Sequence, residues 1–269
     1  MKKTRKYILY TVFALLLMLL ISTVAYAASD ASAGGILETI KAKIHLNFIK
    51  DDRWKYITDG LKRTLLISFF AVIIGIVLGF IIAVLRSTFD TMDKKNVFTR
   101  AINGFLKAYL TVIRGTPALI QLMIIYFVIF MPMGVDKFLA AVICFGLNSG
   151  AYVAEIVRGG IMSIDDGQSE AGRSLGFGYM ATMWHIVFPQ AFKAVLPALA
   201  NEFVVLLKET SIAFYIGLGD LMYAGNAIRA ATYSAFMPLI AVAVIYLVMV
   251  LALSKLVGIL ERRLRNSER

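Results

Sequence analysis

Long apolar stretches alternate with short polar connections along the chain, and this pattern predicts helices that cross a membrane. A helix needs about 20 mainly apolar residues to span a hydrocarbon core of about 30 Å. Five stretches reach that length, at residues 61–85, 105–131, 136–157, 195–218 and 236–258. We therefore predict an all-α integral membrane protein with about five transmembrane helices, preceded by a further apolar segment at the N-terminus.

The N-terminal segment, residues 1–28, has the features of a signal peptide. A basic start is followed by an apolar stretch and then by Ala25-Tyr26-Ala27, a pattern typical of a cleavage site. The apolar stretch is also long enough for an uncleaved signal anchor, so both forms stay open. Either form makes residues 29–60 an extracytoplasmic preface, although five Lys and Arg residues between positions 41 and 55 argue against that side.

The composition agrees with a membrane protein. The chain is 59% hydrophobic and 17% charged, with a mean hydropathy of +0.78, whereas soluble domains are closer to half apolar. A net charge of +11 would suggest nucleic-acid binding in a soluble protein. Here Lys and Arg gather in the connections and the tail, so we predict no nucleic-acid partner. The single Cys and two distant His residues predict no disulfide and no metal site.

The basic residues also orient the predicted spans. They crowd the connection between the first two spans and the tail at 259–269, whereas the connections at 131–137 and 219–235 carry only Lys137 and Arg229. The crowded sides should face the cytoplasm, with the mature N-terminus outside and the C-terminus inside. The connection at 158–193 then also faces the cytoplasm.

This cytoplasmic connection contains a polar segment interrupted by glycines, residues 168–190. It includes, in order, Glu170, Ala171, Gly172, Arg173, Gly176, Ile186 and Pro189. We predict a short helix over 168–175, a turn at Gly176 and a second helix over 179–187 ended by Pro189. A protruding element with Glu170 and Arg173 on it is suited to docking a partner. The alternative is an ordinary connector, although such connectors are usually shorter.

Residues 168–190 resemble the EAA loop of permease subunits in ABC importers, with Gly172 in place of Ala and Phe188 in place of Leu. Other segments match that family in the same order: residues 61–68, 113–117, 147–152, 154–161, 188–191 and 207–211. Together they resemble the polar amino acid subfamily (His/Glu/Gln/Arg/opine), from about residue 55 to the C-terminus. The resemblance implies an ABC importer transmembrane domain of the type I fold over residues 61–258.

The resemblance also implies partners. A permease of this family lies in the cytoplasmic membrane of a bacterial cell and carries a polar amino acid across the lipid bilayer. It works with a second permease, either another copy or a homologue, with a cytoplasmic ATPase dimer and with an extracytoplasmic solute-binding protein. The chain has no phosphate-binding G-x4-G-K-[ST] loop, so ATP and Mg are expected on the ATPase and no cofactor on this chain.

Polar residues inside the predicted spans are candidates for the substrate path. A charge in mid-span costs about 2.5–3.5 kcal/mol on insertion scales, so it usually faces a cavity or a partner. Asn201 and Lys208 lie seven residues apart on one helical stripe, and Asn148, Tyr152 and Glu155 form a second stripe on another span. Lys208 would suit the carboxylate of an amino acid, and the second stripe its ammonium. The alternative is a structural pair of Lys208 with Glu202, Glu209 or another subunit.

Two further features concern packing. Pro117 interrupts the second span and predicts a kink near Gly115. Gly75 and Gly79 in the first span predict close approach of another helix. The sequence shows no catalytic constellation, so we predict no enzyme, with translocation driven by ATP hydrolysis in the partner. The alternative function is an ion-driven secondary amino acid carrier or a channel, which usually shows inverted repeats or discontinuous helices in both halves.

Overall fold

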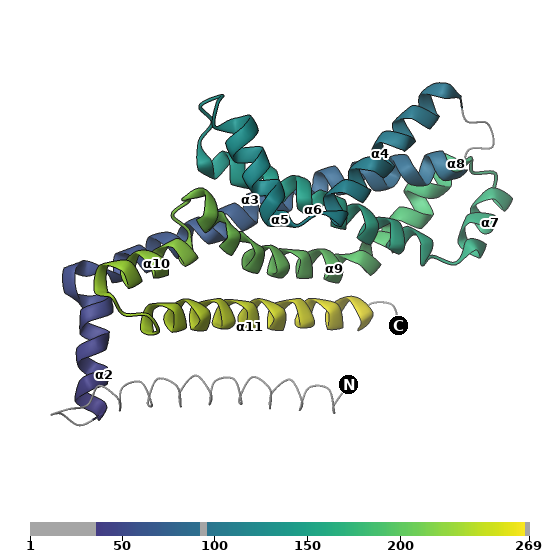
Figure 1. Cartoon of the computed structure of the whole chain (residues 1–269). Coiled ribbons are helices and arrows are strands. Elements are labelled where there is room, and N and C mark those ends of the chain that lie inside the picture. The colour runs from purple at the N-terminus through teal and green to yellow at the C-terminus, as the bar shows by residue number, and fades with distance from the viewer. Residues whose placement is uncertain (1–35, 92–95, 267–269) are drawn as a thin grey trace. The chain divides into compact units, whose positions relative to one another are not determined.

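The computed structural model describes residues 36–91 and 96–266, and all of its regular elements in these ranges are helices (Figure 1). The predicted signal segment, residues 1–28, lies outside the described residues. The helices in chain order are α2 (Ile36–Ile44), η1 (His45–Ile49), η2 (Lys50–Asp52), α3 (Trp54–Thr91), α4 (Val97–Gly115), α5 (Ala118–Met123), η3 (Ile124–Phe130), α6 (Lys137–Met162), α7 (Asp166–Ser174), α8 (Tyr179–Thr182), η4 (Met183–Val187), α9 (Phe188–Glu209), η5 (Thr210–Ile216), α10 (Leu221–Thr232) and α11 (Met237–Asn266).

Four helical runs are long and apolar enough to cross a membrane: Trp54–Asp90, Lys137–Met162, Tyr179–Ile216 and Met237–Leu264. A fifth candidate is the pair Val97–Gly115 and Ala118–Phe130, whose two parts are bent by 109°. The all-helical prediction and the kink near Gly115 are thus confirmed. The bend follows from Pro117, which cannot donate a backbone hydrogen bond to the preceding turn.

Two helical segments lie outside the predicted spans. The first long helix begins at Trp54 rather than at residue 61, so it includes the last part of the predicted preface. The connection at 219–235 contains a helix, α10, that we had not predicted. Both segments were missed for one reason. Hydropathy locates the apolar part of a helix but does not detect amphipathic turns, whether they continue that helix or form a separate one.

Pro189 does not end a helix, contrary to our prediction. It lies in the first turn of α9, and one helical run continues from Tyr179 to Ile216. The widened turn η4 precedes it, in which the backbone N–H of Phe188 donates to the carbonyl of Met183. Such a π-type turn shifts the hydrogen-bond pattern by one residue and makes room for the proline ring.

The described residues form two compact units, and each is considered alone. The first contains residues 36–61 and 221–247. Its buried polar centre is Asn47, whose amide donates to the Lys43 carbonyl (2.7 Å) and to the Ser234 hydroxyl (3.3 Å). Thr232 donates to the Asn47 side-chain oxygen at 2.8 Å. These bonds join η1 to the segment between α10 and α11.

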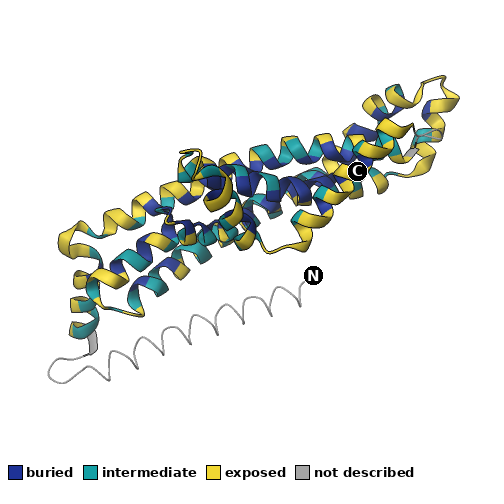
Figure 2. Ribbon diagram, turned by 45° about the horizontal axis from the view of Figure 1, so that its top comes forward, coloured by how far each residue is buried: buried dark blue, intermediate teal, exposed yellow. Residues whose placement is uncertain are grey.

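The second unit contains residues 62–220 and 248–266. Its apolar centre gathers around the fully buried Phe145 of α6, with Ile67 of α3, Leu122 of α5 and Leu206 of α9. Buried residues mark the inner faces of these helices, and exposed residues their outer faces (Figure 2). Close approach at Gly75 and Gly79 is confirmed, because added Cβ atoms would lie 2.6 Å from Ser149 Oγ and from Val153 Cβ, respectively.

Candidate functional site

The predicted stripe on α6 faces the break between α4 and α5. Asn148 is buried, and its amide nitrogen donates to Gln121 Oε1 at 2.9 Å. Gln121 Nε2 in turn donates to the carbonyls of Ile113 (2.7 Å) and Thr116 (3.0 Å). The Ile113 carbonyl is the group that a residue at position 117 would bond in a continuous helix, and Pro117 has no N–H to offer. Gln121 therefore supplies the missing donor and fixes the break to α6.

Glu155 lies at the centre of a cluster of arginines. Its carboxylate pairs with Arg86 of α3 at 3.0 Å and with Arg158 of its own helix at 2.9 Å. Arg114, the residue next to the end of α4, lies 3.9 Å away. Three cations thus share one carboxylate at a junction of three helices. Glu155 was one of three candidates for contact with a substrate ammonium. In this structure its carboxylate oxygens contact arginines instead.

Tyr152 is the most accessible member of the stripe, with 39% of its surface exposed. The Arg114 guanidinium lies 5.8 Å from the centre of its ring, within the range of a cation–π contact. Tyr109 of α4 also donates from its hydroxyl to the Leu147 carbonyl of α6. The end of α4 is thus fixed to α6 through several polar contacts.

The second predicted stripe lies on α9. Asn201 and Lys208 are both exposed, and within the described ranges neither has a side-chain hydrogen bond or ion pair. Glu202, the residue after Asn201, is instead buried, and its carboxyl group accepts a hydrogen bond from the Ser149 hydroxyl of α6 at 2.9 Å. The structure therefore places the two stripes on packed neighbouring helices but shows no polar contact that joins them.

The loop at 168–190 folds back on itself. Its first helix, α7, is capped by Asp165, the residue before its first turn. The Asp165 carboxylate accepts a hydrogen bond from the Gly167 N–H at 2.7 Å. Gly176 makes the turn with φ = +84°, a conformation that favours glycine. Gln190 Nε2 then donates to Gln168 Oε1 at 3.1 Å and holds the start of α7 against α9. The first short helix and the turn at Gly176 were predicted from the sequence, whereas the second helix continues beyond its predicted end at Pro189.

Gly172, which departs from the EAA pattern, is buried between α7 and α8. A Cβ atom there would lie 2.7 Å from Thr182 Cγ2 and 3.0 Å from Ile186 Cδ1. The missing side chain is thus what allows the two helices to pack, and Ile186 is part of that contact. Ala171 beside it is exposed, as is Pro189 in the first turn of α9.

Glu170 and Arg173 are exposed and line an open cleft of about 340 Å³ between α7 and α8. Asp166, Tyr179 and Thr182 also line it. The cleft has both apolar and charged walls, and its charged side chains project from a short, braced element. This arrangement is suited to contact with another protein.

Sequence reasoning missed Gln121 and Arg86. Gln121 could have been noticed as the single strongly polar residue in the apolar run Ala118–Phe130. Arg86 offered no such signal, because it follows a span directly and is indistinguishable there from a residue of the basic connection. No group of three or more His, Cys, Asp or Glu residues in the described part of the chain could hold a metal ion.

Comparison with known proteins gives a consistent result. The profile of the family described as "Binding-protein-dependent transport system inner membrane component" matches residues 75–266. The "Arginine transport system permease protein ArtQ" of Bacillus subtilis (strain 168) is 41% identical over 216 residues, which cover 79% of this chain and 94% of that protein. The "Glutamine transport system permease protein GlnP" of Escherichia coli (strain K12) is 36% identical over 215 residues, covering 77% and 92% of the two chains.

Solved structures show the same likeness. A chain from the "Crystal structure of an amino acid ABC transporter with histidines" has a TM-score of 0.71 and 39% identity, covering 86% of this chain and 99% of that chain. A chain of the MetNI methionine ABC transporter in an inward-facing conformation has a TM-score of 0.68 at 20% identity, covering 80% and 99%, respectively. The second likeness concerns the fold alone.

Proposed function

The chain belongs to the family of inner membrane components of binding-protein-dependent transport systems, and on that premise we propose that it is the permease subunit of an ABC importer for a polar amino acid. The observation that carries the proposal is the 41% identity to an arginine transport permease across 94% of that protein's length. The likeness in fold to an amino acid ABC transporter at 39% identity supports it. The same premise supports a multi-pass location in the bacterial cytoplasmic membrane with the C-terminus in the cytoplasm.

In this proposal the chain forms the path and does not itself hydrolyse ATP. ATP and Mg are bound by a cytoplasmic ATPase dimer, and a solute-binding protein delivers the substrate from outside. A second permease, identical or homologous, completes the membrane part. The loop at 168–190 contacts the ATPase through Glu170 and Arg173, whose exposure beside an open cleft supports this role.

Replacing Glu170 by alanine should uncouple ATP hydrolysis from transport. Loss of one charge-assisted contact between proteins, worth about 1.5 kcal/mol, corresponds to about a tenfold fall in coupled uptake. Amino acid uptake and ATPase rate are measured on the full assembly in proteoliposomes. Glu261→Ala, which removes an equally exposed carboxylate from α11, is the matched control. Unchanged uptake and hydrolysis in Glu170→Ala would show that the loop does not couple the two subunits through this residue.

Substrate contact is assigned to Lys208 for the carboxylate and to Tyr152 for the ammonium, with Asn201 beside the path. The support is that Lys208 is exposed and makes no close ion pair within the described ranges, although its charge acts on the adjacent Glu209 carboxyl. Asn148 and Glu155 have their polar atoms engaged by Gln121 and by arginines, so they act here by holding α4 and α5 in place.

Lys208→Met should abolish uptake while the complex still assembles, and Lys208→Arg should keep part of it, because a cation is retained for the carboxylate. Lys107→Met, which removes an exposed lysine from α4, should leave uptake unchanged. Uptake is compared at equal amounts of assembled complex in proteoliposomes. Wild-type uptake by Lys208→Met would remove Lys208 from the substrate path.

A further inference from the structure

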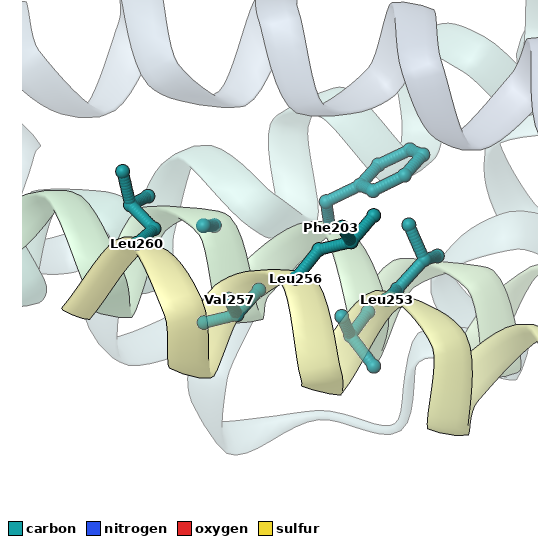
Figure 3. Close-up of a pocket in the computed structure, with 7 residues that line it drawn as sticks. Phe203, Leu253, Leu256, Val257 and Leu260 are labelled. Atoms are coloured by element: carbon teal, nitrogen blue, oxygen red, sulfur yellow. The ribbon is translucent and has the colours of Figure 1, made fainter. Parts of the chain in front are cut away.

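An apolar groove runs between α9 and the second half of α11, within one compact unit of the protein. It holds about 230 Å³ and is lined from α9 by Ala200 and Phe203 and from α11 by Leu253, Leu256, Val257 and Leu260. Figure 3 shows Phe203 lying across from Leu253 and Leu256. The residues that line it are all apolar, and Leu256 has 61% of its surface exposed. The groove is therefore open to the surroundings of the helices.

These surroundings are hydrocarbon. Both walls belong to helical runs apolar enough to span a membrane, and only 11% of the most apolar window of Met237–Leu264 is buried. An open apolar groove between such helices fits the acyl chain of a lipid, which needs apolar contacts and no hydrogen-bond partner.

Two cations continue the walls of the groove at one end. Arg263 follows Leu256 by seven residues and Leu260 by three, so it lies on the same stripe of α11. Lys193 precedes Ala200 by seven residues and continues the stripe of α9. The two helices run in opposite directions (Figure 1). Because Lys193 precedes the lining residues of α9 and Arg263 follows those of α11, both cations lie beyond the same end of the groove. Both are exposed, and neither has a hydrogen bond or ion pair within the described residues.

We propose that this groove is a binding site for an anionic glycerophospholipid, with one acyl chain between α9 and α11 and the phosphate between Lys193 and Arg263. The two cations favour an anionic lipid, rather than a second copy of the same chain, as the occupant of the groove. A copy related by a twofold axis along the membrane normal would bring further cations to an end that already carries two.

Binding is measured by native mass spectrometry of the full chain in detergent, with added palmitoyl-oleoyl phosphatidylglycerol or phosphatidylcholine. The double variant Lys193→Gln/Arg263→Gln should bind phosphatidylglycerol about 25-fold more weakly, about fivefold for each cation removed. Its binding of phosphatidylcholine should stay unchanged. Leu256→Trp, which fills the groove and keeps both cations, should weaken the binding of both lipids.

The matched control is Lys255→Gln/Arg262→Gln. Lys255 and Arg262 are exposed and both belong to α11. They lie seven residues apart on a stripe of that helix that does not continue the groove. This variant should bind phosphatidylglycerol like the wild type. The proposal is overturned if both double variants lose equal affinity, since the effect would then be general surface charge. It is also overturned if Leu256→Cys forms a disulfide between two copies in the assembled complex, since a protein would then cover the groove.

Discussion

Replacing Glu155 by glutamine should destabilise the protein by about 2–3 kcal/mol, because it leaves the arginines of a partly buried cluster without the carboxylate that they share. Glu155 is the carboxylate on which Arg86, Arg114 and Arg158 converge, at 3.0, 3.9 and 2.9 Å. Glutamine keeps the shape of the side chain but removes the charge that holds three guanidinium groups together. The mutual repulsion of these groups would then separate the ends of α3 and α4 from α6.

The measurement is thermal unfolding of the purified full chain in detergent, followed by circular dichroism. The control is Arg158→Gln, which removes one cation and leaves Glu155 paired with Arg86. Arg158→Gln should lower the free energy of unfolding by only about 1 kcal/mol, because it removes one partly exposed ion pair. A Glu155→Gln variant as stable as Arg158→Gln would mean that the carboxylate does not hold the cluster.

Replacing Gly79 by leucine should prevent α3 and α6 from packing. A Cβ atom at this position would lie 2.6 Å from Val153 Cβ and 2.8 Å from the backbone nitrogen of Ala154. A side chain could rotate away, but the backbone of α6 can move only if the whole helix moves. Overpacking in a well-packed core costs about 1–3 kcal/mol and more where the backbone cannot yield. We therefore expect a loss of at least about 3 kcal/mol or failure to assemble.

The matched control for this position is Gly104→Leu. Gly104 lies on the exposed side of α4, and an added Cβ atom there would meet no heavy atom within 4 Å. The two variants add the same side chain, so any difference in yield and unfolding temperature reports the helix contact. Equal stability of the two variants would contradict the close contact at Gly79.

The number of long helices could be predicted from the sequence because each apolar stretch must be about as long as the hydrocarbon core is thick. Their ends could not, and Pro189 shows why. A proline after a helical segment usually signals its end, yet here the hydrogen-bond shift in η4 lets the chain continue. The bend at Gly115 was predictable, because Pro117 follows it with no such widened turn.

The polar stripe of Asn148, Tyr152 and Glu155 was also predictable, because a spacing of four and then three residues fixes one face of a helix. What that face contacts was not. Gln121 and Arg86 lie 27 and 69 residues away from their partners, and spacing within one helix carries no information about such pairs. The sequence therefore predicted which side chains share a direction, and the structure showed that two of them, Asn148 and Glu155, have their polar atoms engaged by Gln121 and by arginines.

The helical run Tyr179–Ile216 has a mechanical consequence. Its 38 residues correspond to about 57 Å at 1.5 Å per residue, longer than the bilayer core is thick. One end is braced against α7 by Gln190 and Gln168, and Lys208 lies near the other. A displacement applied at the end braced by α7 would therefore be carried along the whole run, and Pro197 inside α9 marks the point where the helix can bend.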